Sequence, residues 1–201
     1  MRVDPSGKLI KTWSTGVDQA NEKGRVFGLS VMGEANVVLS DFSEHKLMEY
    51  SPDGQLIREI HLSSDVGNPN PSHAIKLTNG NFLVCCGSLG DDLHEGPTVF
   101  TVDVEGKLTK SYSGICGSIV RQINYPIYLS VDGNGYVMVV DWGNCRVLLL
   151  DSDLKFKREI LSRDRHGLQW PERILLDEST GRLFVADNDW NNQRILIFEF
   201  K

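Results

Sequence analysis

The chain has 201 residues, which is enough for one domain, or for one array of small units, with a substantial buried core. Hydrophobic residues make up 40% and charged residues 24%, as is ordinary for a soluble globular protein. The net charge of −6 argues against a DNA- or RNA-binding surface, because phosphate binding needs clustered Lys and Arg. No apolar run approaches the roughly 20 residues that span a membrane.

The N-terminus and the cysteines predict a cytoplasmic protein. Residues 1–11 include Asp4, Pro5 and Gly7 and lack the apolar core of a signal peptide. Adjacent Cys85 and Cys86 would point to opposite faces of a strand, so they form a poor metal-binding pair. With no secretory signal, we expect these two, together with Cys116 and Cys145, to be reduced thiols.

The first repeat unit is predicted over residues 14–62. It contains an apolar run that ends at Ser40-Asp41 and a second run that begins at Lys46. The turn sequence Ser51-Pro52-Asp53-Gly54 then leads into Leu56–Ile60. Turn residues between short β-rich runs indicate consecutive antiparallel hairpins.

The second unit, over residues 63–113, is degenerate. Pro71 opens its first apolar run, and Cys86 stands where Asp is expected. Its return strand at residues 98–102 comes late, after an acidic insertion at residues 87–97. The insertion lacks the regular ligand spacing of a calcium loop, so we interpret it as a surface loop.

The third and fourth units are the clearest and are predicted over residues 114–161 and 162–201. Pro126 and Pro171 open them, and Val140-Asp141 and Ala186-Asp187 end their second strands. The equivalent positions Asp41, Cys86, Asp141 and Asp187 recur about every 45–55 residues, with four strands in each repeat. A four-stranded meander cannot bury both faces alone, whereas radial stacking buries them against each other. The sequence therefore predicts an all-β protein, a β-propeller of four antiparallel blades.

The ends of the chain predict how the last blade is completed. Residues 3–10 match residues 50–57, so the chain begins at the last hairpin of a unit and ends at a third strand. We expect the N-terminal segment, residues 1–13, to supply the outer strand of the C-terminal blade and so to remove an exposed edge. Whether four blades close a ring or belong to a larger propeller is left open.

These repeats resemble NHL repeats, most clearly in residues 140–147, residues 185–187 and residues 192–195. The resemblance covers nearly the whole chain. It implies a propeller like those of tripartite-motif ubiquitin ligases, bacterial secreted proteins, and related lactonase and amidating-lyase enzymes. That family usually has six blades, so four units depart from its pattern. No RING, B-box or coiled-coil segment is present, so the resemblance implies no ligase activity.

The recurring Asp41, Asp141 and Asp187 are interpreted as structural. Such an Asp can accept backbone N–H groups of the following turn and pair with the basic residue of the third strand, which is Lys46, Arg146 or Arg194. Catalysis needs one site rather than one in every blade.

The residues two places after the strand-opening position are candidates for a binding site. The first unit has Gly28 there, and the others have His73, Tyr128 and Arg173, with Glu172 beside the last. Innermost strands begin near the axis, so these side chains are expected to converge on one channel mouth. They would bind a small polar ligand or a peptide, or fill the channel by Arg173–Glu172 pairing and stacking. A metal site would use His73 and Glu172 as two ligands.

Trp142 and Trp190 are predicted to lie in equivalent turns between second and third strands, where exposed aromatic side chains commonly anchor interfaces. The leading hypothesis is a non-catalytic scaffold that binds a protein or peptide through blade loops and the channel mouth. The first alternative is a metal-dependent hydrolase or lyase similar to propeller lactonases. The second is an RNA-binding domain, which the net charge disfavours. We expect no cofactor, with calcium or zinc left open, and neither a membrane nor a DNA partner.

Overall fold

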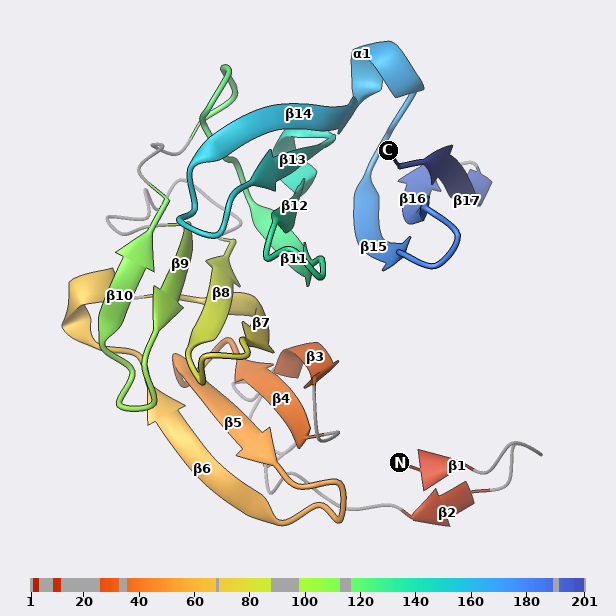
Figure 1. The fold of residues 1–201 in the computed structure, drawn as a ribbon. Helices are drawn as coiled ribbons and strands as arrows, with labels where there is room; N and C mark the ends of the chain where they lie inside the picture. The colour runs from red at the N-terminus through yellow and green to blue at the C-terminus, as the bar shows by residue number, and fades with distance from the viewer. Residues whose placement is uncertain are drawn as a thin grey trace.

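The computed structural model describes residues 2–3, 9–11, 26–32, 36–67, 69–87, 98–112, 117–189 and 192–200. Most of them lie in antiparallel sheets, each made of strands that are consecutive in the sequence. The four large sheets follow one another around a common axis, as Figure 1 shows. The predicted β-propeller of four repeat units is therefore confirmed.

Three of the sheets, blades 1 to 3, contain four strands each. Blade 1 comprises β3 (Val26–Met32), β4 (Asn36–Asp41), β5 (Lys46–Tyr50) and β6 (Leu56–His61). Blade 2 comprises β7 (Pro71–Lys76), β8 (Phe82–Cys86), β9 (Val99–Val102) and β10 (Leu108–Ser111). Blade 3 comprises β11 (Pro126–Val131), β12 (Val137–Asp141), β13 (Arg146–Leu150) and β14 (Phe156–Ser162).

Blade 4 has three strands among the described residues: β15 (Pro171–Asp177), β16 (Arg182–Asp189) and β17 (Asn192–Glu199). The N-terminal strands β1 (Arg2–Val3) and β2 (Leu9–Lys11) pair with each other, Val3 opposite Leu9. The predicted pairing of the N-terminal segment with the last blade is therefore not among the strand pairings of the described residues. In this part of the chain β17 is an edge strand.

Short helices occur only in connections within the described ranges. They are η1 (Ser64–Val66), η2 (Trp142–Asn144) and α1 (Arg163–His166). The predicted turn at residues 51–54 carries its glycine in the left-handed region, with Gly54 at φ 79°, and the turns at Gly80 (φ 90°) and Gly135 (φ 81°) do the same. None of the described helices is long and apolar enough to cross a membrane.

The same irregularity begins the innermost strand of every blade. The register shifts between Val26 and Gly28 in β3, and at the corresponding places Pro71/His73, Pro126/Tyr128 and Pro171/Arg173. Proline has no N–H to donate, so it is tolerated at the first residue of a strand. The shift falls at the same place in each blade, so Gly28, His73, Tyr128 and Arg173 are in equivalent positions.

Most of the described core lies between consecutive blades, while one cluster, made of Leu39, Met48 and Tyr50, belongs to blade 1 alone. Val38 and Leu47 of blade 1 cluster with Phe82 and Phe100 of blade 2. Ile75 and Leu83 of blade 2 cluster with residues of blade 3 such as Leu129, Val139 and Leu148. Met138 and Val147 of blade 3 cluster with Ile174 and Val185 of blade 4. Each blade therefore has a back, which faces the preceding blade, and a front, which faces the next one.

Candidate interaction site

The equivalent residues of the innermost strands form a row of rings and charge across blades 2, 3 and 4. The His73 and Tyr128 rings stack with centroids 4.1 Å apart and an interplanar angle of 24°. The Arg173 guanidinium also lies over the Tyr128 ring, 5.0 Å from its centroid. The structure thus brings together three of the side chains that the sequence placed at the channel mouth. We call them the axial row.

His73 is the buried end of the axial row. Its side chain is in the core, and the Leu129 N–H donates to Nδ1 at 3.3 Å. Burial, and to a smaller extent the Arg173 charge, lower the pKa of His73 to about 4, while the nearby Leu29 backbone acts in the opposite direction. His73 is therefore a neutral imidazole near pH 7 that joins the inner strands of neighbouring blades.

Arg173 is the exposed end of the axial row. Its Nη1 donates to the main-chain carbonyl of Glu172 at 2.8 Å. The Glu172 carboxylate turns instead to the side chain of Asn188, with Oε1 2.9 Å from Nδ2. The stacking expected of a filled channel is present. The expected pairing of the Arg173 and Glu172 charges is not among the described contacts, which join the two residues through the Glu172 backbone carbonyl.

Gly28 occupies the corresponding position in blade 1 because a side chain does not fit there. A Cβ at this residue would lie 2.5 Å from the Ser72 carbonyl oxygen and 2.8 Å from the His73 Cα. Backbone atoms cannot move aside as a flexible side chain can. The glycine lets the inner strands of blades 1 and 2 approach, and the axial row begins only at His73.

A second group of aromatic residues lies at the same end of the propeller. Pro126 pairs with Asp141, so the start of β11 and the turn between β12 and β13 are at one end of blade 3. In that turn, the Trp142 ring lies 5.4 Å from Tyr125 and 4.7 Å from Trp170. We call Tyr125, Trp142 and Trp170 the aromatic cluster.

The aromatic cluster reaches from blade 2 to blade 4. A Cβ added to Gly87 would come 2.8 Å from the Tyr125 ring, so this glycine marks a close contact. At the other end, the Arg163 guanidinium lies 5.4 Å from the Trp170 centroid. Arg163 also donates to Cys145 Sγ at 2.9 Å and to the Gln169 carbonyl at 3.2 Å. All three aromatic side chains are half-buried, so each retains a solvent-accessible part.

Trp142 thus lies in the turn that the sequence predicted, although it packs between two aromatic rings rather than standing alone. The matching prediction for Trp190 concerns a residue outside the described part of the chain. Tyr125 and Trp170 were not selected as site residues from the sequence. Both immediately precede a strand-opening proline, Pro126 or Pro171, and that position identifies residues at this end of the propeller.

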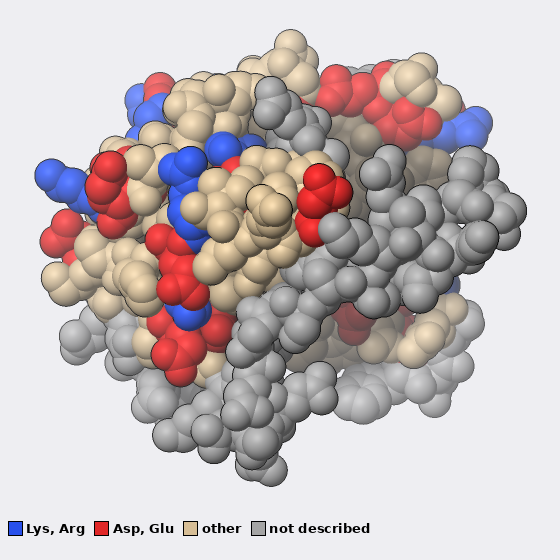
Figure 2. All heavy atoms as spheres, turned by 90° about the horizontal axis from the view of Figure 1, so that it is seen from below, with Lys and Arg blue, Asp and Glu red and all other residues tan. Residues whose placement is uncertain are grey.

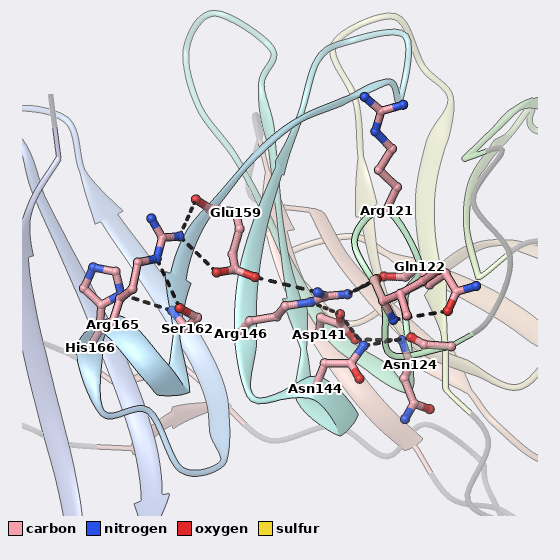
Figure 3. Close-up of polar contacts among 12 residues, drawn as sticks. Arg121, Gln122, Asn124, Asp141, Asn144, Arg146, Glu159, Ser162, Arg165 and His166 are labelled. Carbon is pink, nitrogen blue, oxygen red and sulfur yellow. Dashed lines mark hydrogen bonds and ion pairs between the residues drawn. The ribbon is translucent and has the colours of Figure 1, made fainter.

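The repeated aspartates brace the loops that carry these aromatic residues. Asp141 Oδ1 accepts the Asn124 backbone N–H at 2.7 Å, and Oδ2 accepts Arg146 Nε at 2.7 Å. Arg146 Nη2 also donates to the Gln122 carbonyl at 2.5 Å (Figure 3). Burial raises the pKa of the Asp141 carboxyl, while its hydrogen bonds act in the opposite direction. This network holds the segment that leads into β11.

Asp187 does the same in blade 4. It accepts the Trp170 N–H at 2.8 Å and pairs with Arg194 at 2.9 Å, and Arg194 also donates to the Gly167 carbonyl. In blade 1 the Asp41 side chain instead accepts the N–H groups of Ser43 and Glu44 in its own turn, each at 3.1 Å. These contacts indicate a structural role for the aspartates. In blades 3 and 4 each aspartate is hydrogen-bonded to the segment that leads into the innermost strand of its own blade.

A cavity of about 300 Å³ lies at this end of blade 4. Its lining includes Glu172, Asn188, Gln193 and Arg194. Glu172 and Asn188 are hydrogen-bonded to each other, and Arg194 is paired with Asp187. These polar groups of the cavity are therefore already engaged within the protein. Within the described ranges, no three His, Cys, Asp or Glu side chains are grouped so that they could hold a metal ion.

On the face that Figure 2 shows, the charges of the described residues do not collect by sign. On the face in Figure 2, Lys and Arg side chains lie beside Asp and Glu side chains, and the described surface there shows no continuous basic area. Arg165 illustrates the pattern, because its Nη2 lies 2.9 Å from Glu159 Oε1 (Figure 3).

The fold is shared with much larger β-propeller proteins. A virginiamycin B lyase from Staphylococcus aureus bound to quinupristin superposes with a TM-score of 0.61 at 15% identity over 90% of this chain and 57% of that one. The nidogen/laminin complex gives 0.62 at 15% identity, over 87% and 61%. Hydrazine synthase from Kuenenia stuttgartiensis gives 0.64 at 13% identity, over 94% and 49%.

These comparisons define a β-propeller and go no further than the fold at such low identity. The chain spans roughly half to three-fifths of the length of these structures. No family model matches the chain, and no curated protein matches it. The resemblance to NHL repeats therefore stays a prediction from the sequence.

Proposed function

We propose that the protein is a non-catalytic scaffold that binds a peptide segment of a partner protein at the end of the propeller where the innermost strands begin. The aromatic cluster carries the proposal, because it places three partly accessible rings side by side on the loops of blades 3 and 4. Tryptophan and tyrosine supply large contact areas with little loss of side-chain entropy, which is why they dominate binding hot spots.

Two exposed guanidinium groups favour a peptide that carries a carboxylate as well as an apolar anchor. Arg163 lies over Trp170, and Arg173 lies over Tyr128. A guanidinium held against a ring is positioned for a bidentate carboxylate contact. The hydrogen bonds of Asp141 and Asp187 to the loops keep the binding groups in place before the peptide arrives, which lowers the entropic cost of association.

The test is a selection of peptides from a random display library on the full chain, followed by titration of one synthetic hit by calorimetry. We expect Trp142→Ala and Trp170→Ala each to weaken binding about tenfold or more, since a hot-spot side chain contributes more than about 1.4 kcal/mol. Arg173→Ala should weaken only those hits that contain Asp, Glu or a free C-terminal carboxylate.

Tyr136→Ala is the matched control. Tyr136 is a partly exposed aromatic residue in the β11–β12 turn, at the other end of blade 3. Its replacement should leave the affinity unchanged. Equal losses in Tyr136→Ala and Trp142→Ala, with both variants folded, would place the peptide elsewhere and refute this site.

A further inference from the structure

The cavity at the end of blade 4 lies on the front of that blade, which is the face turned away from blade 3. Ala186 of β16 is paired with Ile195 of β17, and both residues line the cavity. The neighbouring residues on these strands, Val185 and Leu196, pack in the core shared with blade 3. Successive side chains of a strand point to opposite faces, so Ala186 and Ile195 face away from that core. Ile195 is 70% exposed, which leaves this apolar part of the cavity open to solvent.

Polar side chains line the cavity beside these two residues. Asn188 is paired with Gln193, two residues along the strands from Ala186 and Ile195, so both side chains lie on the same face. Glu172, at the start of the innermost strand β15, lines the cavity as well. We call these five residues the front pocket.

The polar groups of the front pocket are arranged to accept hydrogen bonds. Asn188 Nδ2 donates to Glu172 Oε1 at 2.9 Å, and this bond orients both side chains while using one atom of each. Glu172 Oε2 and Asn188 Oδ1 remain as acceptors that have no hydrogen bond among the described contacts. Asp187 and Arg194 also line the cavity, and their charges neutralise each other across 2.9 Å. Glu172 is therefore the carboxylate of the lining that lacks an ion-pair partner among the described residues.

Two acceptor oxygens and an uncompensated negative charge, beside apolar surface, suit a cation on an alkyl stem. Ammonium and guanidinium groups carry only donors, and the stems of Lys and Arg pack along apolar surface while their heads stay hydrogen-bonded. A carboxylate or phosphate would be repelled by Glu172, and an apolar group would leave the two oxygens without partners. The volume of about 300 Å³ is at the lower end of the range for ligand sites, so the cavity has room for one side chain.

We propose that the front pocket binds a basic side chain of the peptide that occupies the aromatic cluster. Arginine is preferred to lysine, because its planar fork donates to Glu172 and Asn188 together while its stem packs on Ile195. The Asn188 N–H donates to the Trp170 carbonyl at 2.9 Å, so the front pocket adjoins the aromatic cluster. The inference rests on the proposed function for the source of this side chain, whereas the front pocket is testable with a single amino acid.

The first test titrates the full chain with Nα-acetyl-arginine amide and, in parallel, with the citrulline derivative. Citrulline is the neutral counterpart of arginine, with oxygen in place of one guanidinium nitrogen. Protein-observed NMR follows the side-chain amide signals of Asn188 and Gln193. We expect the arginine derivative to shift both signals with a dissociation constant in the millimolar range, and the citrulline derivative to bind at least about tenfold more weakly.

Glu172→Gln keeps an acceptor for Asn188 and removes the charge, so it should weaken binding of the arginine derivative about tenfold or more. Glu105→Gln is the matched control, because Glu105 is an exposed carboxylate in the β9–β10 turn of blade 2. It changes the net charge by the same amount and should leave the affinity unchanged. Circular dichroism would verify that both variants keep their β structure.

Equal affinity for the arginine and citrulline derivatives overturns the proposal, as does binding that the two variants weaken equally. So does the absence of any shift in the Asn188 and Gln193 signals up to the solubility limit of the arginine derivative. Shifts confined to other parts of the molecule would place the cation elsewhere and also refute the front pocket.

The second test separates this inference from the proposed function. Trp142→Ala should weaken library peptides and leave the affinity for the arginine derivative unchanged. Glu172→Gln should weaken only those peptides that contain Arg or Lys. Peptide binding that is indifferent to Glu172→Gln would refute the front pocket alone. Binding of the arginine derivative by a chain that selects no peptide would support the cation site and contradict the proposed function.

Discussion

Blades 3 and 4 share the repeat pattern most clearly and have very different environments. Blade 3 packs on both faces, so its front residue Val147 is fully buried. Blade 4 packs on its back alone among the described residues, and the equivalent Ile195 is 70% exposed. The same apolar repeat position is thus core in one blade and surface in the next. In a stacked array, burial belongs to the pair of neighbouring blades rather than to the repeat itself.

The largest expected effect is on the free energy of unfolding when a charged side chain is placed at either of these two equivalent positions. Val147→Glu buries an unpaired carboxylate and should lower the free energy of unfolding by about 4 kcal/mol or more. Ile195→Glu should change it by about 0.5 kcal/mol or less, because the side chain stays in water. Urea denaturation at a concentration where the chain is monomeric measures both. Equal losses would show that the front of blade 4 is covered within one chain.

The second comparison concerns the repeated aspartates. The Arg146 side chain is 7% exposed, whereas the Arg194 side chain is 33% exposed. Asp141→Asn should therefore cost about 3–5 kcal/mol, because it leaves a buried guanidinium without its main partner. Asp187→Asn should cost about 1–3 kcal/mol, since Arg194 can still be hydrated.

Thermal or urea unfolding of these two variants separates the roles of the aspartates. Adding Arg146→Met to Asp141→Asn should recover much of the loss, because the isolated buried charge is then gone. A double variant that is no more stable than Asp141→Asn would mean that the loop hydrogen bonds, not the ion pair, dominate in blade 3.

The third comparison concerns the two ends of the axial row as a function of pH. The folded-state pKa of His73, about 4, lies below the unfolded value of about 6.5, so the neutral form is favoured by folding. Stability is complete above pH 6.5 and falls as the pH decreases toward 4, by about 3 kcal/mol in total. Urea unfolding across this range checks the loss.

His73→Phe keeps a ring to stack on Tyr128 and removes the titration. Its unfolding free energy should lack this component, and the difference from the wild-type curve isolates it from the carboxylates. Arg173→Met should reduce the loss, because Arg173 lowers the His73 pKa. Parallel wild-type and His73→Phe curves between pH 6.5 and 4 would contradict the neutral, buried state of the ring.

Much of the candidate site could be predicted from the sequence, because it depends on repeat position. His73, Tyr128 and Arg173 share one place after the strand-opening residue, and the structure stacks them. Glu172 does not occupy this repeated position, and its carboxylate is hydrogen-bonded to Asn188 instead. Trp142 was identifiable from its turn, but its contacts with Tyr125 and Trp170 join segments that the repeat pattern does not relate.

By itself, the sequence determined the repeat, the strand order within each blade and the structural role of the aspartates. These features rest on local signals: turn glycines, strand-opening prolines and apolar runs that recur every unit. Only the tertiary structure decided which apolar faces meet. Leu29 and Ile195 have the composition of core residues, and nothing local distinguishes them from Leu129 or Val147. Ile195 is exposed because blade 4 packs on its back alone among the described residues, and hydrophobic burial depends on the surface that excludes the water.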